Sequence, residues 1–146
     1  VFGEHGDTSF IPWTGAYISG VSLDEYYELA KNLGKDVEEL DKDEMLTYVQ
    51  KSGGKVIANK GATFYAVSAA VCKLCGILLA SSDSIATVSS MMHGEYGIED
   101  VCVSTLTLVG PNGIQGKVPM RMNKEEIAKL QASANALKEV IKQIEL

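Results

Sequence analysis

The residue best suited to proton transfer in this sequence is His5, which lies in the run Gly3-Glu4-His5-Gly6-Asp7. Imidazole is the side chain that most readily both gives and takes a proton near neutral pH. The glycines around it allow the backbone to turn tightly and bring the ring into a cleft. We therefore interpret His5 as a candidate general acid and base. The plainer alternative is that it caps a turn or makes a surface hydrogen bond.

A nucleophilic triad around the same histidine is less favoured. Asp7 would orient His5, and Thr8 or Ser9 would act as the nucleophile. Residues so close in sequence seldom point at one another in the way that a triad requires. The second histidine, His93, falls at the edge of an expected strand, and we interpret it as structural.

A second candidate group is the hydroxyl of Thr63, which follows Lys60-Gly61-Ala62 and precedes a long apolar stretch. At a helix N-terminus such a hydroxyl either caps the helix or faces an anion such as a carboxylate, which the helix dipole favours. From spacing alone, plain capping is the simpler interpretation.

The three cysteines predict no metal or redox chemistry. Cys72 and Cys75 form a Cys-x-x-Cys motif, but it lies inside the apolar stretch with no second pair and no histidine near it. We expect these two to fill the core. With Cys102 the count is odd, which suits free thiols in a reducing compartment, and we expect a cytoplasmic protein.

Periodicity predicts three helices in the first half of the chain. Ser22 and Glu25 form a capping box that begins a short helix, which Gly34 ends. A second helix is expected from 36 to about 52, ended by Gly53 and Gly54. The stretch 60–81 is apolar almost all round, which predicts a long helix buried on most sides.

The second half predicts strands and a last helix. The stretches 84–92 and 101–109 are rich in Val, Thr and Ile, and a Pro-Asn-Gly turn separates the second of them from a third expected strand at 114–122, which favours a small antiparallel sheet. Asn123 and Glu126 form a capping box before an amphipathic C-terminal helix. The fold class expected is α+β, in one domain over 1–146.

The composition of the chain limits the classes of partner that it could bind. A net charge of −6 disfavours nucleic acid and anionic membrane surfaces, and no apolar run approaches the roughly 18 residues of a membrane-spanning helix. The glycine-rich fingerprint of a dinucleotide-binding fold is missing. The chain begins with Val next to a motif that looks functional, so we expect it to be a fragment with more protein upstream.

Several linked motifs resemble the L-lactate dehydrogenases of the lactate/malate dehydrogenase family, and the resemblance covers essentially the whole chain. The run from Gly3 to Thr8, followed by Pro12-Trp13-Thr14, resembles the family's catalytic-histidine motif. The other motifs follow in the family's order: Lys60-Gly61-Ala62-Thr63 with Tyr65-Ala66-Val67, Gly94-Glu95-Tyr96-Gly97 with Asp100-Val101, Val109-Gly110 with Asn112-Gly113, and Ser133-Ala134 with Leu137-Lys138.

The resemblance implies an NAD-dependent enzyme of glycolysis and fermentation that interconverts pyruvate and L-lactate. His5 would protonate the carbonyl oxygen as NADH delivers hydride, and would take the proton back when lactate is oxidised. Thr63 would lie beside the substrate, and Val67 would pack on the nicotinamide. The family's N-terminal Rossmann domain, its substrate-binding arginines and the aspartate that orients the histidine have no counterpart here, so the fragment alone is expected to be inactive.

Two alternatives stay open. One is the same fold acting on malate or another 2-hydroxy acid, although Glu4 favours lactate because malate enzymes often carry glycine before the histidine. The other is a non-catalytic folding or oligomerisation module, since family members are commonly homotetramers and the C-terminal helix offers a suitable surface.

Overall fold

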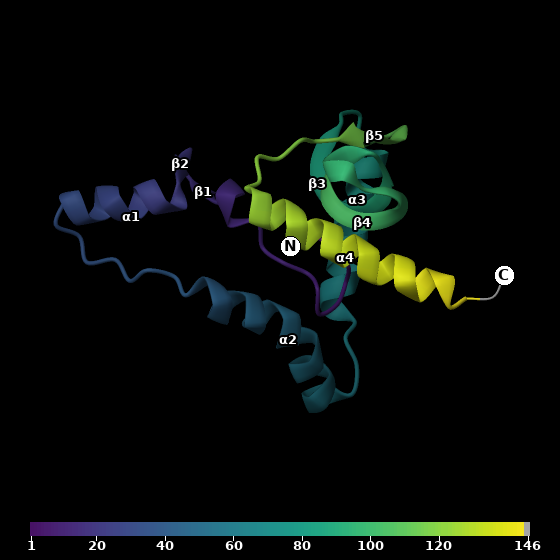
Figure 1. Ribbon diagram of the computed structural model, residues 1–146, viewed down its shortest axis with the longest axis horizontal. Coiled ribbons are helices and arrows are strands. Elements are labelled where there is room, and N and C mark those ends of the chain that lie inside the picture. The colour runs from purple at the N-terminus through teal and green to yellow at the C-terminus, as the bar shows by residue number, and fades with distance from the viewer. Residues whose placement is uncertain (145–146) are drawn as a thin grey trace.

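The computed structural model describes residues 1–144 and shows an α+β fold, as expected. The four α-helices are α1 (Leu23–Asn32), α2 (Lys42–Lys60), α3 (Tyr65–Leu79) and α4 (Lys124–Lys142). The main sheet contains β3 (Ser84–His93), β4 (Glu99–Gly110) and β5 (Gly113–Lys117), and a short hairpin is made by β1 (Tyr17–Ile18) and β2 (Val21–Ser22). In Figure 1, α4 crosses in front of the β3–β4 hairpin, while α1 and α2 extend away from it.

The core lies where β3 and β4 meet α4 and the N-terminal segment. The main sheet is antiparallel with the order β3-β4-β5, and alternate residues of β4 point into the core. Burying this apolar surface is the main force that holds the domain together. The buried cluster consists of Phe2, Phe10, Met92, Ile98, Val101, Val103, Leu130 and Ala134.

The two predicted capping boxes are confirmed. The Ser22 side chain accepts a hydrogen bond from the backbone N–H of Glu25, and the Glu25 side chain accepts one from Ser22. Asn123 and Glu126 make the same reciprocal pair at the start of α4. Each box satisfies backbone N–H groups that a helix leaves without partners at its N-terminus.

Some predicted boundaries are wrong. The second helix begins at Lys42, where Asp41 caps it, and continues through Gly53 and Gly54 to Lys60. A glycine inside a helix costs only about 1 kcal/mol, so this pair does not end it. The end comes at Gly61, which adopts a left-handed conformation. The last strand ends at Lys117, short of the predicted 122.

The prediction that the apolar stretch 60–81 forms a helix buried on most sides is wrong in its burial. The helix is there as α3, but none of its residues is buried. One side faces β3 and β4 across an apolar cleft of about 540 Å³, lined by Leu74 and Ile77 of the helix and Leu106 of β4, among others. The rest of its surface has no cover from residues 1–144. An apolar pattern indicates surface that favours burial, but it does not say which polypeptide buries it.

The cysteine prediction is corrected for the same reason. Cys72 and Cys75 are exposed on α3, so they do not fill the core, and Cys102 on β4 is exposed as well. All three are free thiols, as expected. Within the described residues, no helix is long and apolar enough to cross a membrane.

Candidate functional site

The loop that carries His5 is closed at its base by two phenylalanines. Phe2 and Phe10 exchange backbone hydrogen bonds of 2.8 and 3.1 Å, and their rings meet edge to face at 6.3 Å. Both side chains are only 3% exposed. Because the two ends of the loop are buried in the core, residues 3–9 leave the body of the domain from a fixed base.

The interior of the loop is held by Glu4 and Thr8. One carboxylate oxygen of Glu4 accepts hydrogen bonds from the backbone N–H of Thr8 at 3.1 Å and from its hydroxyl at 2.6 Å. Hydrogen bonds to a charged acceptor are stronger than those between neutral groups. The chain on either side of His5 is therefore tied together by the side chain that precedes the histidine.

Ser133 of α4 anchors the same loop to the helix. This fully buried hydroxyl accepts a hydrogen bond from the backbone N–H of Glu4 at 2.8 Å and lies 2.9 Å from the Thr8 hydroxyl. Ser133 occupies a position on the apolar stripe of α4 next to Ala134. A hydroxyl at a core position needs a partner, and the loop supplies it.

Gly3 allows the close approach of loop and helix. Its φ is +95°, and a Cβ there would lie 2.6 Å from the Ser133 hydroxyl oxygen. Its backbone also pairs with Ser104 of β4 through two hydrogen bonds of 2.8 and 3.1 Å. The glycine that sequence analysis assigned to turning freedom thus also meets a steric requirement.

Helix α2 supports the far side of the loop. The side-chain amide of Gln50 donates to the backbone carbonyls of Asp7 and Ser9, both at 2.9 Å. The loop is therefore tied to β4, α4 and α2 at once. Gln50 was not identified from the sequence, since a glutamine on a solvated helix carries no distinguishing signal.

The imidazole of His5 projects from this framework without partners. His5 is exposed, and within residues 1–144 its side chain makes no hydrogen bond or ion pair. The Thr8 hydroxyl is occupied by Glu4 and Ser133, and no hydrogen bond joins Asp7 to the ring. The arrangement agrees with the low weight given to a nucleophilic triad.

Thr63 and Val67 lie at the start of α3. Thr63 is exposed and does not cap the helix, because the cap position is Phe64, which makes no side-chain capping bond. The capping interpretation of Thr63 is therefore wrong, and its hydroxyl is left exposed. Val67 is 55% exposed. No hydrogen bond within the described chain joins either residue to His5.

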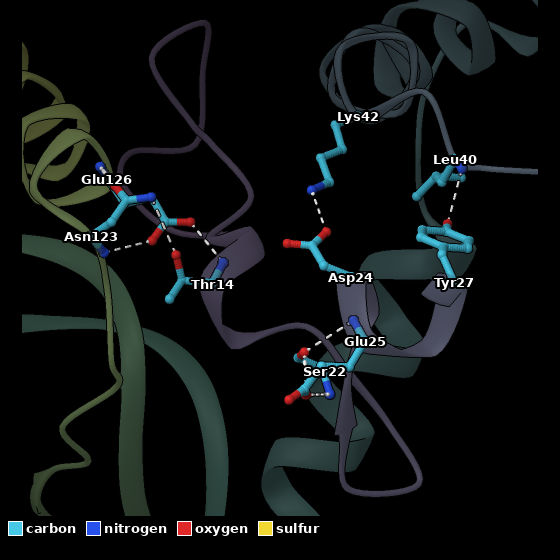
Figure 2. A network of polar contacts seen from close by, with 9 residues as sticks. All are labelled: Thr14, Ser22, Asp24, Glu25, Tyr27, Leu40, Lys42, Asn123 and Glu126. Carbon is cyan, nitrogen blue, oxygen red and sulfur yellow. Dashed lines mark hydrogen bonds and ion pairs between the residues drawn. The ribbon is translucent and has the colours of Figure 1, made fainter. Parts of the chain in front are cut away.

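A second polar network holds the segment after the loop, as Figure 2 shows. The Glu126 carboxylate, whose residue is only 6% exposed, accepts from the backbone N–H of Thr14 at 2.9 Å and of Asn123 at 3.0 Å. Burial acts to raise the pKa of Glu126, but the hydrogen bonds from Thr14 and Asn123, aided by Lys129, outweigh it and lower the pKa below its ordinary value of 4.5. Sequence analysis assigned Glu126 to the capping box but missed its bond to Thr14.

Figure 2 also shows how α1 and α2 are joined. The Lys42 ammonium lies 3.2 Å from Asp24, and the Tyr27 hydroxyl accepts from the backbone N–H of Leu40 at 2.9 Å. These contacts are exposed, so each contributes little to stability. No group of three or more side chains that could hold a metal ion occurs within residues 1–144.

Fold and loop together define an α+β domain that presents one histidine on a braced glycine-bracketed turn. The sequence model of one protein family, the lactate/malate dehydrogenase alpha/beta C-terminal domain, matches residues 1–146. The chain therefore belongs to the lactate/malate dehydrogenase family, as its C-terminal domain.

Individual proteins similar to this chain are members of the same family. An L-lactate dehydrogenase of Acetivibrio thermocellus is 38% identical over 146 residues, which cover all of this chain and 45% of that protein. The solved minor L-lactate dehydrogenase of Enterococcus mundtii superposes with a TM-score of 0.89 at 26% identity, over 100% of this chain and 45% of the other.

A malate dehydrogenase is also among the relatives. The solved enzyme of Archaeoglobus fulgidus in complex with NADH superposes with a TM-score of 0.79 at 28% identity, over 97% of this chain and 42% of the other. The chain thus spans a little under half the length of the relatives it matches.

Proposed function

We propose that this chain is the substrate-side half of an NAD-dependent L-lactate dehydrogenase, with His5 as the proton donor and acceptor. The observation that carries the proposal is the His5 loop. Its backbone is tied at both ends and on three sides, while the imidazole is left exposed and without partners. A catalytic acid needs this combination of fixed position and free ring.

In the proposed reaction the carbonyl group of a 2-keto acid accepts a hydride at carbon and a proton at oxygen. Bound NADH supplies the hydride. His5 donates its proton to the carbonyl oxygen, and in the reverse direction it accepts the hydroxyl proton of the 2-hydroxy acid. The braced loop holds the ring at a constant place, so little reorganisation is needed when the proton moves.

Thr63 and Val67 provide the other contacts that we propose. Because Thr63 does not cap α3, its hydroxyl is free to donate to the substrate beside it. Val67, four residues after Thr63, is apolar and 55% exposed. It offers the kind of surface on which a nicotinamide ring packs. The residues present therefore fit the cofactor at its nicotinamide end.

We propose that the rest of NAD is held by a Rossmann domain that precedes residue 1. The sequence of this chain has no glycine fingerprint for a dinucleotide, and the relatives it matches are about twice as long. The isolated chain is then inactive, because it lacks the groups that clamp the substrate carboxylate. We place the complete enzyme in the cytoplasm as a homo-oligomer, a tetramer like others of its family.

Glu4 supports lactate over malate. Its carboxylate accepts hydrogen bonds from the backbone N–H and the hydroxyl of Thr8 and so holds the loop together, a role that a glycine at this position could not fill. The curated relative named above, 38% identical over the whole chain, is an L-lactate dehydrogenase. A 2-keto acid with a small apolar side chain, such as pyruvate, is the substrate that we propose.

The test is NADH oxidation by the full-length protein with pyruvate and with oxaloacetate. A higher kcat/KM with pyruvate is expected. A higher value with oxaloacetate would keep the role of His5 but move the function to malate. If NADH is oxidised with neither substrate, the dehydrogenase proposal is contradicted.

The exposed apolar helix α3 favours a second candidate, a folding or oligomerisation module without catalysis of its own. Tyr65 and Leu79 on this helix are 79% and 87% exposed. Light scattering of the chain during size-exclusion chromatography would test it, since a monomer would leave the module without support.

A further inference from the structure

The loop that carries the candidate histidine contains a tight turn over residues 6–9. The backbone N–H of Ser9 donates to the carbonyl of Gly6 at 3.1 Å and closes the turn. The peptide group between Asp7 and Thr8 lies at the middle of the turn, and neither its C=O nor its N–H takes part in the closing hydrogen bond. Partners outside the turn therefore set the orientation of this central peptide group.

Both ends of the central peptide group have such a partner. Its N–H, which belongs to Thr8, donates to a Glu4 carboxylate oxygen at 3.1 Å. Its carbonyl, which belongs to Asp7, accepts a hydrogen bond of 2.9 Å from the side-chain amide of Gln50 on α2. The central peptide group is thus held between the carboxylate that precedes His5 and an amide of α2.

Gln50 also holds a second peptide group of the loop. Its amide nitrogen donates to the carbonyl of Ser9 at 2.9 Å. The N–H of that peptide group belongs to Phe10 and donates to the Phe2 carbonyl at 3.1 Å, within the buried base of the loop. An amide nitrogen carries two hydrogens, and both partners are carbonyls that only a donor can face. One nitrogen atom therefore joins the turn to the base.

A chain of hydrogen bonds runs from α2 to the residue before His5. The Gln50 amide polarises the Asp7 carbonyl, which strengthens the donation by the N–H at the other end of the same peptide group. That N–H is bonded to the carboxylate of Glu4, and Glu4 is covalently joined to His5. A shift of the Gln50 amide would therefore displace the backbone that carries the imidazole.

We propose that Gln50 is a positioning residue for the proton transfer of the proposed dehydrogenase, on which function this role depends. It acts through the two peptide groups of the turn and fixes the place from which His5 reaches the substrate oxygen. Its removal should therefore slow the chemical step. A displacement of about 1 Å can cost a hundredfold in rate, and the loop keeps its ties to Ser133 and Ser104, so we expect a smaller loss.

The test is the single-turnover rate of NADH oxidation by the full-length protein with pyruvate or oxaloacetate, whichever gives the higher kcat/KM. Gln50→Leu keeps the bulk of the side chain and removes both donors, so the rate should fall on the order of tenfold. Asn59→Leu is the matched control on α2, because the Asn59 amide donates to the Lys55 carbonyl of the same helix at 2.8 Å. An undiminished rate in Gln50→Leu would overturn the proposal.

Two charged variants test the need for a donor. Gln50→Lys places N–H donors within reach of both carbonyls again, so it should recover most of the lost rate. Gln50→Glu has nearly the shape of the original side chain, but its carboxylate can only accept, so it should be at least as slow as Gln50→Leu. Equal rates in the lysine and glutamate variants would show that the hydrogen bonds do not act as proposed.

A double-mutant cycle with His5 separates positioning from a general structural effect. If Gln50 acts through His5, Gln50→Leu should change the rate by less than about twofold in a His5→Asn background. A tenfold loss that persists in this background would overturn the role of Gln50 and leave the proposed function standing. A His5→Asn variant as fast as wild type would instead contradict the proposed function itself, and the role of Gln50 with it.

Discussion

The loop of His5 and the helix α3 carry the proposed chemistry together, but they are built in opposite ways. The loop is exposed only at its tip, and its base and flanks are tied to the core, to β4, to α4 and to α2. Helix α3 has the most apolar sequence of the four helices, and yet none of its residues is buried. The polar segment is therefore held more firmly than the apolar one.

The difference teaches that hydrophobicity and burial are separate properties of a segment. Burial needs a second surface, and residues 1–144 provide α3 with cover on one side only. The loop does not need a long apolar sequence, because a few hydrogen bonds to buried groups hold it in place. The two regions should therefore respond very differently to substitution.

The largest expected effect on stability separates the core from α3. Leu130→Ala empties a site that is 0% exposed, and it should lower the free energy of unfolding by about 2–5 kcal/mol. The same change at Leu79, which is 87% exposed, should alter it by less than about 0.5 kcal/mol. Urea denaturation of both variants measures the difference. Equal losses would show that α3 is covered as well as the core is.

A smaller effect is expected at the contact between loop and helix. Gly3→Ala places a Cβ 2.6 Å from the Ser133 hydroxyl oxygen, whereas Gly20, with a similar φ of +85°, has nothing within 4 Å. The Gly3 variant should lose about 1–3 kcal/mol more than Gly20→Ala, because only Gly3 adds overpacking to the cost of its φ. Chemical denaturation compares the two. Equal destabilisation would mean that the loop moves away from α4 easily.

Removal of the Ser133 hydroxyl should cost less. Ser133→Ala leaves the N–H of Glu4 without its partner, and because this group is half-buried we expect a loss of about 1 kcal/mol in stability. Turnover should also fall, since the loop of His5 loses its tie to α4. Ser68→Ala on the exposed side of α3 is the control and should change neither quantity. Unchanged turnover in the Ser133 variant would argue that the tie does not position His5.

The smallest expected effect is the pH dependence that Glu126 contributes. Because its pKa is lowered in the folded state, its contribution to stability is complete above its ordinary value of 4.5 and is lost as the pH falls through the lower folded value. Wild type should thus exceed Glu126→Gln in stability at pH 6, and the gap should narrow below pH 4.5. Thermal unfolding across this range measures it. A gap that widens in acid would contradict the sign.

The sequence predicted the elements whose signals are local. The capping boxes at Ser22 and Asn123 marked two helix starts, because a cap is settled by residues three positions apart. The strands followed from their composition and from the turn at Pro111. Gly53 and Gly54 misled the prediction for α2, since their cost is outweighed along a helix of 19 residues.

The residues of the candidate site were predicted from the sequence, but the hydrogen bonds that hold the His5 loop in place were not. His5 stood out through its residue type and its glycines, and the resemblance to the family supplied Thr63 and Val67. The ties from Ser133 and Gln50 join positions far apart in sequence, so no local pattern reports them. A serine on the apolar stripe of α4 was the one available signal, because a buried hydroxyl must find a partner.

The role of His5 is tested most directly by the single-turnover rate of NADH oxidation with pyruvate in the full-length protein. His5→Asn keeps a polar side chain of similar shape but cannot act as an acid, so the rate should fall on the order of a hundredfold or more. His93→Asn, at the exposed end of β3, is the matched control and should stay within about twofold. A His5 variant that retains a rate within a few-fold of wild type would contradict the account.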